Sequence, residues 1–386
     1  FVMPTLIPDI ILQCIILQLL FILLFFPVAG LASQQAGQSM PQIDTCNAQN
    51  VFRQQQNAPG HLIKFNTDSI PRYLAEHSVG PPAREYLYKV IRRMPHSTRA
   101  FTQGLAFYDN YLFEGTGLLG QSEIRKLETE TGRLLISKKT DSLAFGEGIS
   151  IKNDRLIQLS WKSERAYLYD VETFELLKEI KYSGEGWGVT HIDDKILISD
   201  GSSLIRGHNV ARFFMADESS QLSNQIKRAV SNVVDAPENT VKNIHVNESG
   251  VEVRGINELE YANGFIYANV WPTDCIAEID PDTGNINAWI NLRNLNPAKS
   301  VTDWNAVLNG IAYQQDKNVF YVTGKYWPYI YVIALQRPEK GRSEKGRPEK
   351  TRPEKRQSDK TQSDKTQPDK TEEQNKAVQH DVYVSL

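Results

Sequence analysis

The chain has 386 residues, a formal net charge of −3 and 40% hydrophobic residues, which suits one large domain with tails. Its nearly balanced charge gives no basic stripe, so nucleic acid is not expected as a partner. Three cysteines are too few and too scattered for a disulfide framework or a zinc ribbon. A Cys46–Cys275 bridge would require an oxidising compartment, and the pattern does not favour it.

The N-terminal region carries a targeting signal. Residues 10–26 are almost unbroken apolar sequence, and small residues suited to signal-peptidase cleavage follow. Residues 1–33 are therefore predicted to be a signal peptide or a signal anchor. This places the protein in the secretory pathway, or outside the cell or in the periplasm, with membrane attachment through residues 10–26 if the segment is retained. Residues 34–84, rich in polar residues and proline, are predicted to be a linker.

A short unit repeats along the middle of the chain. Residues 145–161 read as two strands around a polar turn, with Glu147 between two glycines at the start and Trp161 at the end. Similar units are anchored at Gly104, Gly148, Gly188, Glu258 and Gly310. Such repetition, with about four strands per unit, is typical of a β-propeller. The sequence thus predicts an all-β, five-bladed β-propeller over residues 85–335, with a β-sandwich as the alternative.

The propeller prediction has two consequences. Innermost strands line a central channel, so equivalent positions of the repeats should converge there: Gln103, Glu147, Trp187, Asn257 and Asn309. The ring must also close, and we expect the strand over residues 86–91 to join the last blade.

Two segments depart from the repeat. Residues 213–236 have helical periodicity, which predicts a helical insertion at about 207–250. Residues 336–386 begin with a five-residue charged period that contains no apolar side chain, and this tail is predicted to be disordered.

Several strings are more specific than a propeller requires, and together they resemble the plant and bacterial type of glutaminyl cyclase, the glutaminyl-peptide cyclotransferases. The resemblance covers roughly residues 86–333. It rests on residues 101–105, 145–148, 186–188, 257–261, 271–277, 307–312 and 322–328.

The resemblance implies a five-bladed propeller that converts the N-terminal glutamine of peptides or proteins into pyroglutamate and releases ammonia. It implies no cofactor for the chemistry. Some members hold a structural divalent cation in the channel, but no His/Cys cluster is present here to carry one. We expect a monomer. The positions that match the family pattern are Phe101, Gln103, Phe145, Glu147, Trp161, Trp187, Asn257, Trp271 and Lys325.

The chemistry suggests roles for these residues. Glu147 is the candidate for both proton transfers, since desolvation between aromatic rings would raise its pKa. Lys325, Gln103 or Asn257 would hold the carbonyl oxygen, and an indole N–H could also donate to it. The aromatic side chains would enclose the substrate; they are Phe101, Phe145, Trp161, Trp187 and Trp271.

Two departures from the family affect loop shape only: the longer segment at 203–256, and Pro272 after Trp271. Other functions also fit a propeller. A calcium-dependent, lactonase-like hydrolase would need an oxygen cage; the candidates are Glu147, Asn257, Asn309 and Asp200. A non-catalytic propeller could bind a peptide or glycan at its aromatic mouth. Chelator sensitivity and turnover distinguish these alternatives. His96 and His208 are expected at the surface.

Overall fold

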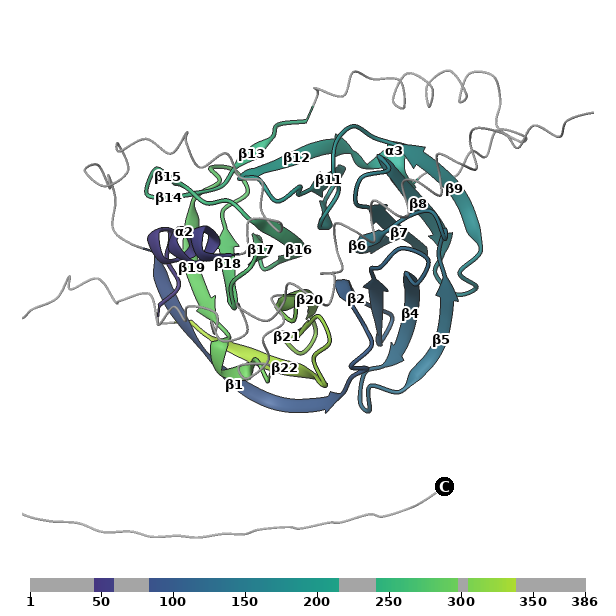
Figure 1. Cartoon of the computed structure of the whole chain (residues 1–386), viewed down its shortest axis with the longest axis horizontal. Helices are drawn as coiled ribbons and strands as arrows, with labels where there is room; N and C mark the ends of the chain where they lie inside the picture. Colours follow the sequence, from purple (N-terminus) through teal and green to yellow (C-terminus); the bar gives the residue numbers. More distant parts are fainter. Residues whose placement is uncertain (1–44, 59–82, 215–240, 298–304, 338–386) are drawn as a thin grey trace, which may run out of the picture. The chain divides into compact units, whose positions relative to one another are not determined.

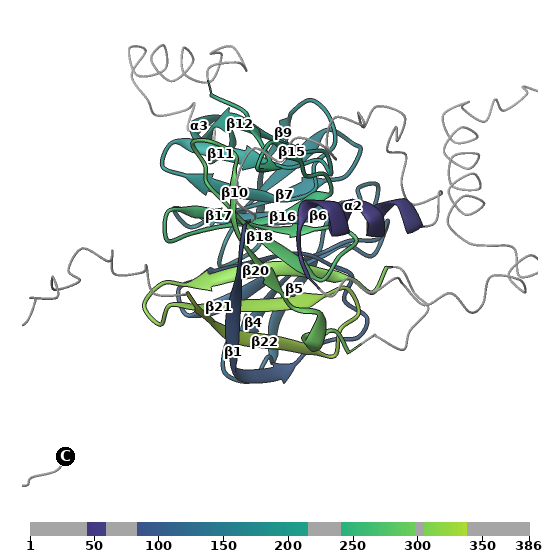
Figure 2. The same ribbon diagram turned by 90° about the vertical axis from the view of Figure 1, so that its left-hand side faces the viewer.

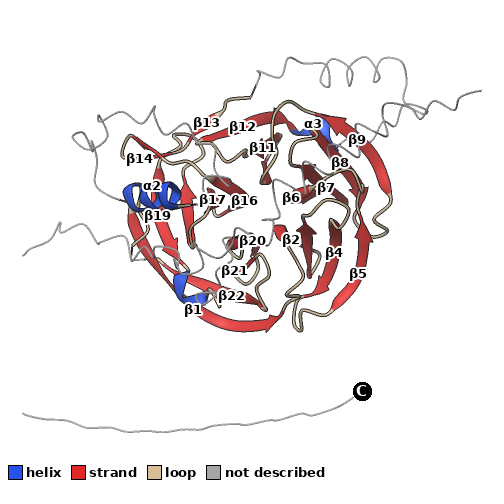
Figure 3. Ribbon diagram, viewed as in Figure 1, coloured by secondary structure: helices blue, strands red, loops and turns tan. Residues whose placement is uncertain are grey.

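A computed structural model describes residues 45–58, 83–214, 241–297 and 305–337. The predicted signal or anchor segment, most of the insertion and the tail lie outside these ranges. The described residues are mainly β-strand (Figure 3), which confirms the all-β class. Within them, no helix is both long enough and apolar enough to span a membrane.

Antiparallel sheets are arranged around a common centre, as Figure 1 shows. The first contains β2 (Thr102–Tyr108), β3 (Tyr111–Thr116), β4 (Glu123–Glu128) and β5 (Leu134–Lys139). The second contains β6 (Gly146–Lys152), β7 (Arg155–Ser160), β8 (Arg165–Asp170) and β9 (Leu176–Lys181). The third contains β10 (Val189–Ile192), β11 (Lys195–Ile198), β12 (Leu204–Asn209) and β13 (Ile244–His245).

The remaining large sheet joins two further groups of strands through β1 (Arg84–Pro95). One group is β16 (Ile256–Ala262), β17 (Phe265–Val270), β18 (Cys275–Ile279) and β19 (Ile286–Asn291). The other is β20 (Leu308–Gln314), β21 (Val319–Gly324) and β22 (Tyr329–Gln336). A small ribbon pairs β14 (Asn247–Glu248) with β15 (Val251–Glu252), and the described helices are α2 (Ala48–Asn57), α3 (Val210–Phe214) and the 3-10 turn η4 (Arg293–Leu295).

The hairpins form where the sequence places short polar turns. Asp109 and Asn110 connect β2 to β3 with φ values of 46° and 63°, and Asn153 and Asp154 connect β6 to β7 with φ values of 50° and 57°. Asn and Asp tolerate this left-handed conformation, and its twist matches that of the flanking strands. The repeated polar turns of the sequence are therefore the hairpin connections.

The innermost strands form a closed series: β2 lies beside β6 and β20, β10 lies beside β6 and β16, and β16 lies beside β20. Figure 2 shows the stacked edges of these sheets from the side. A Cβ atom on Gly104 would lie 2.7 Å from the Ile149 nitrogen, and one on Gly188 would lie 2.1 Å from the Asn257 oxygen. The repeated glycines therefore allow inner strands to approach closely.

Strand β1 closes the series at its outer edge, as predicted. It pairs antiparallel with β22 from Leu87 to Pro95, and parallel with β19 through Arg84 to Tyr86. The first long strand of the described region thus lies beside the last one.

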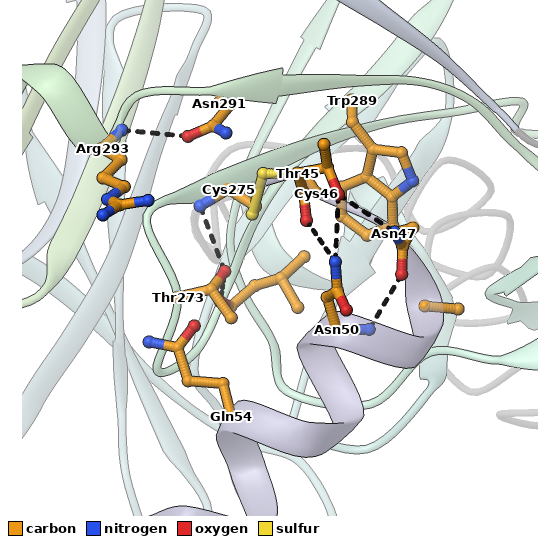
Figure 4. The surroundings of a disulfide bond; sticks show 12 residues. Thr45, Cys46, Asn47, Asn50, Gln54, Thr273, Cys275, Trp289, Asn291 and Arg293 are labelled. Atoms are coloured by element: carbon orange, nitrogen blue, oxygen red, sulfur yellow. Dashed lines mark hydrogen bonds between the residues drawn. A yellow bond between two sulfur atoms is a disulfide. The ribbon is translucent and has the colours of Figure 1, made fainter. Parts of the chain in front are cut away.

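The predicted linker and insertion both differ from the structure. Residues 34–84 include α2, which is capped by Asn47 and joined to β18 by a Cys46–Cys275 disulfide (Figure 4). The helix buries only a narrow apolar face, so its glutamine-rich sequence resembled a linker. In the expected insertion, β12 and β13 pair through Leu204–His245 and Ile205–Ile244. Both ends of residues 207–250 therefore belong to a sheet.

Candidate active site

Irregular pairing at the inner strands directs several polar side chains to one place. The pairing register shifts between Thr102 and Gly104, between Gly146 and Ile149, between Ile256 and Leu259, and between Leu308 and Ile311. Such bulges re-aim side chains. The residues within these shifts include Gln103, Glu147, Asn257 and Asn309.

All nine predicted site residues line one pocket, together with Asn305, which the sequence analysis missed. The pocket has a volume of about 120 Å³. Sites for drug-sized ligands measure about 300–1,000 Å³. The pocket therefore suits a single side chain. Its lining residues are Phe101, Gln103, Phe145, Glu147, Trp161, Trp187, Asn257, Trp271, Asn305 and Lys325.

Aromatic rings form much of the pocket wall. Phe101 packs edge-on against Phe145 at 5.9 Å between ring centroids, and Phe145 packs against Trp161 at 5.6 Å. In a second pair, Trp187 packs against Trp271 at 6.2 Å. Edge-to-face contacts of this kind fix ring orientation. The wall is therefore a preformed apolar surface.

A buried acid and a buried amine face this apolar wall. Glu147 is 5% exposed and Lys325 is 7% exposed. Desolvation raises the pKa of Glu147 well above its usual value; the positive charge of Lys325 opposes that rise and the negative charge of Glu185 adds to it. Desolvation lowers the pKa of Lys325 to about 8, against the opposing effect of Glu147. Burial thus moves the two pKa values toward neutrality.

Neither group forms a salt bridge with another described residue. Among the described residues, no hydrogen bond or salt bridge engages the Glu147 carboxyl group or the Lys325 ammonium group. Lys325 Nζ lies 4.5 Å from the centroid of the Phe101 ring, a cation–π contact. Both groups therefore remain available to a ligand in the pocket.

The amide side chains of the pocket differ in what they can offer. Asn309 Nδ2 donates to Gln103 Oε1 at 3.1 Å, which leaves the Gln103 Nε2 hydrogens for a ligand. Asn257 Oδ1 is buried and has no hydrogen-bond partner among the described residues. Because a buried acceptor without a partner is unfavourable, this oxygen is suited to receive an N–H group. Gln103 therefore offers a donor, and Asn257 offers an acceptor.

The indole N–H groups of two tryptophans are not free for an oxyanion, contrary to one of our expectations. Trp161 Nε1 and Trp187 Nε1 both donate to Glu185 Oε2, at 2.9 Å and 3.1 Å. The sequence analysis missed Glu185. A signal was present, because Gly184-Glu185-Gly186 has the same pattern as Gly146-Glu147-Gly148. The surface expectation was wrong for both histidines: the His96 side chain is buried against Glu114 and the Trp327 carbonyl oxygen, and His208 is buried as well.

The four residues considered for a calcium cage do not all line the pocket. Asp200 Oδ1 accepts hydrogen bonds from the Ser202 backbone and hydroxyl groups, and Asn309 Nδ2 is directed at Thr102 and Gln103. Of the four candidates, Glu147 and Asn257 line the pocket.

A structural cation in the channel stays a prediction. The described ranges contain no group of three His, Cys, Asp or Glu side chains that could hold a metal ion. On inner strand β16, the buried carboxyl group of Glu258 accepts hydrogen bonds from the Leu105 and Ile311 backbone nitrogens, at 3.3 Å and 2.9 Å. The Glu258 carboxyl group therefore links β16 to β2 and β20.

The fold and the pocket define a class: an all-β protein with a small aromatic-walled pocket that contains a buried carboxyl group and a buried amine, both with pKa values shifted toward neutrality. A family model described as glutamine cyclotransferase matches residues 68–234 and 234–335. The chain belongs to this family.

Two relatives agree with the family assignment. A glutaminyl-peptide cyclotransferase of Arabidopsis thaliana is 37% identical over 253 residues, which cover 64% of this chain and 71% of that protein. The crystal structure of Myxococcus xanthus glutaminyl cyclase aligns with a TM-score of 0.55 and 32% identity, covering 66% of this chain and 99% of that chain.

Proposed function

We propose that this chain is a glutaminyl-peptide cyclotransferase that converts the N-terminal glutamine of peptides or proteins into pyroglutamate and releases ammonia. The family assignment supports the activity. One observation supports the assignment of the site. Buried Glu147 and buried Lys325 line the same pocket, which has room for one side chain. An N-terminal glutamine side chain fits such a space, while the rest of the peptide stays outside.

Glu147 carries both proton transfers in this proposal. The α-amine of the substrate attacks the side-chain carbonyl carbon, a C–N bond forms, and the Glu147 carboxylate takes the proton that the amine loses. Glu147 then gives this proton to the side-chain nitrogen as the C–NH₂ bond breaks and ammonia leaves. Burial brings the pKa of Glu147 closer to that of an α-amine, about 7.7–8.0. Proton transfer in both directions is therefore easier than it is for an exposed carboxylate.

The other polar groups stabilise the intermediate. Lys325 Nζ and Gln103 Nε2 donate to the oxygen that becomes negative, and such donors act most strongly in a site that excludes water. Asn257 Oδ1, which has no partner among the described residues, accepts from a substrate N–H group. The five aromatic rings enclose the side chain and favour the folded rotamer in which amine and carbonyl meet. No step requires a metal ion or cofactor.

The fold proposal accompanies the functional one. We propose that the described sheets are the blades of a five-bladed β-propeller, with β1 completing the last blade and the pocket at one mouth of its channel. The closed series of inner strands supports this interpretation. We also propose a monomer.

The location is also proposed. The disulfide between Cys46 and Cys275 suits an oxidising compartment, in agreement with a secretory signal or anchor in residues 1–33. We propose that the protein acts in the secretory pathway, or in the extracellular or periplasmic space, with residues 10–26 attaching it to a membrane if they are retained.

The test is ammonia release from a Gln-Ala dipeptide by the purified protein, with and without a chelator, and with mass spectrometry to detect the cyclised product. We expect chelator-resistant release that falls by about a hundredfold or more in Glu147→Gln. Glu179→Gln is the matched control, because Glu179 is an exposed carboxylate on β9 that pairs with Arg165 of β8. Release abolished by chelator would favour a metal hydrolase, and folded protein without turnover would favour a binding module.

A further inference from the structure

The aromatic wall of the pocket consists of two groups of rings. One runs from Phe101 through Phe145 to Trp161, and the other joins Trp187 to Trp271. Trp161 follows β7, whereas Trp187 precedes β10, so the two indoles come from different sheets. The width of the pocket between these sheets depends on what connects the two rings.

A single carboxylate oxygen makes that connection. Glu185 lies in the segment between β9 and β10, and its Oε2 atom accepts from Trp161 Nε1 at 2.9 Å and from Trp187 Nε1 at 3.1 Å. Two donors that converge on one charged oxygen form stronger and more directional bonds than neutral pairs do. Both indoles are therefore held at a fixed distance from the same atom.

The surroundings hold Glu185 itself in place. Its backbone oxygen accepts a hydrogen bond from Arg206 Nη2. Its second carboxylate oxygen lies 3.9 Å from Lys162 Nζ, which also sits 4.0 Å from the centroid of the Trp161 ring. The Glu185 side chain is 41% exposed, so its position at the rim depends on these contacts rather than on burial.

Glu185 also acts on the acid at the base of the pocket. Its negative charge is one cause of the raised pKa of Glu147. The other groups that face Glu147 are Lys325, whose positive charge acts in the opposite direction, and Tyr182, whose own pKa is raised partly by Glu147. Loss of the Glu185 charge should therefore lower the pKa of Glu147.

We infer that Glu185 is a positioning residue of the cyclase site, which spaces Trp161 and Trp187 through one carboxylate oxygen. The inference rests on the proposed function, and it adds a residue that does not line the pocket. A purely structural carboxylate at this position would affect folding but would leave the acid limb of the pH profile unchanged.

The experiment compares two substitutions with different predicted effects. Glu185→Gln keeps an acceptor oxygen but loses the charge, so KM should stay near the wild-type value while the acid limb of kcat/KM moves to lower pH. Glu185→Ala loses the acceptor as well, and KM should rise by about tenfold or more because the indoles lose their spacing. Glu179→Gln should leave both quantities unchanged. Thermal unfolding verifies that each variant is folded.

A second measurement does not depend on turnover. In protein labelled with ¹⁵N at the six tryptophan indoles, Trp→Phe variants assign the Trp161 and Trp187 signals. Their hydrogen exchange should accelerate by about tenfold or more in Glu185→Ala and stay nearly unchanged in Glu185→Gln. Unchanged exchange in Glu185→Ala would overturn the spacing role, and an unshifted acid limb in Glu185→Gln would overturn the electrostatic role. Wild-type protein without turnover would refute the proposed function, while exchange would still test the indole bridge.

Discussion

Asn309 donates from Nδ2 to Gln103 Oε1 at 3.1 Å, and the same nitrogen donates to the Thr102 carbonyl oxygen at 3.0 Å. The Gln103 amide is thereby oriented with its oxygen away from a ligand and its Nε2 hydrogens available. Asn309 is a fully buried side chain of β20, whereas Gln103 belongs to β2. A residue of the last sheet thus decides which end of the amide on the first sheet can act in the pocket.

Asn309→Asp should reverse this amide. A carboxylate can only accept, so Gln103 would turn its Nε2 toward Asp and present its oxygen to the substrate. We expect kcat to fall by about a hundredfold, which is the usual effect of losing one oxyanion donor. Asn153→Asp, in an exposed turn, is the control. An unchanged kcat in a folded Asn309→Asp protein would show that Gln103 does not act as a donor.

The rate should depend on pH through both buried charges. The pKa of Glu147 is raised, so the carboxylate that accepts the proton is lost as pH falls through this value. The pKa of Lys325 is lowered to about 8, so its positive charge is lost as pH rises through this value. A plot of kcat/KM against pH should therefore fall on both sides. In Lys325→Arg the alkaline fall of kcat/KM near pH 8 should disappear, because arginine stays charged. If the variant keeps the same alkaline fall as the wild type, a group other than Lys325 causes it.

A buried network of charges makes stability depend on pH. Glu114 accepts from Arg125, Thr102 and His96, and despite desolvation these partners lower its pKa to about 2. Its contribution is present above the usual pKa of 4.5 and is lost as pH falls toward 2. The pKa of His96 is raised from 6.5 by Glu114 and by the Trp327 carbonyl. Its contribution is present below 6.5 and is lost as pH rises through the raised value.

Glu114→Gln should therefore lower the free energy of unfolding most between pH 4.5 and 6.5, by an amount on the order of a few kcal/mol. The difference from wild type should shrink at pH 3 and at pH 9. Urea unfolding at the three pH values measures it. Glu123→Gln is the control, because this more exposed carboxylate lies 3.8 Å from the same Arg125 and should change stability by less than about 1 kcal/mol. A difference independent of pH would contradict the assignment.

The disulfide should support the pocket as well as the fold. It holds α2, in which Gln55 Nε2 donates to the Trp271 and Arg254 carbonyl oxygens, each at 2.9 Å. Replacing both cysteines by serine should lower the free energy of unfolding by roughly 2–5 kcal/mol. It should also speed trypsin cleavage after Arg53 and raise KM as Trp271 loses its support. Unchanged cleavage and KM would show that α2 stays docked without the bond.

Gly201 supports the Trp187 ring directly. Its φ is +79°, and a Cβ atom would lie 2.6 Å from Trp187 Cη2. Gly201→Ala should displace the indole and raise KM. Gly250→Ala is a matched control, because Gly250 has a φ of +87° and open space around it. Both variants should lose about 1–2 kcal/mol of stability, but only Gly201→Ala should change KM. Equal KM values would show that Trp187 tolerates the added methyl group.

Features that repeat locally could be predicted from the sequence. The polar turns, the glycine-flanked strand starts and the closing strand at residues 86–91 all follow from patterns within a few residues. The same patterns predicted that Gln103, Glu147 and Asn257 would lie close together. The prediction is confirmed, because each residue lies at an equivalent register shift in its strand.

Features that depend on contacts between distant segments could not be predicted. The helix α2 docks through glutamines and a disulfide across 229 residues, and a polar sequence of this kind gives no apolar period. Glu185 has the same glycine-flanked pattern as Glu147, but the sequence does not show that its carboxylate contacts both Trp161 and Trp187. His96 was placed at the surface because a single histidine reveals nothing about a buried glutamate beside it.

The pairing of β1 with β22 has a consequence for biosynthesis. During translation β1 leaves the ribosome before every strand with which it pairs, and Cys46 must wait for Cys275 across 229 residues. At about 5–20 residues per second, this interval lasts roughly ten seconds or more. The nascent chain therefore carries the Cys46 thiol without its partner until β18 is made, and most of β1 without its antiparallel partner until β22 is made. A chain that stops before β22 would leave Leu87 to Pro95 of β1 without its antiparallel partner.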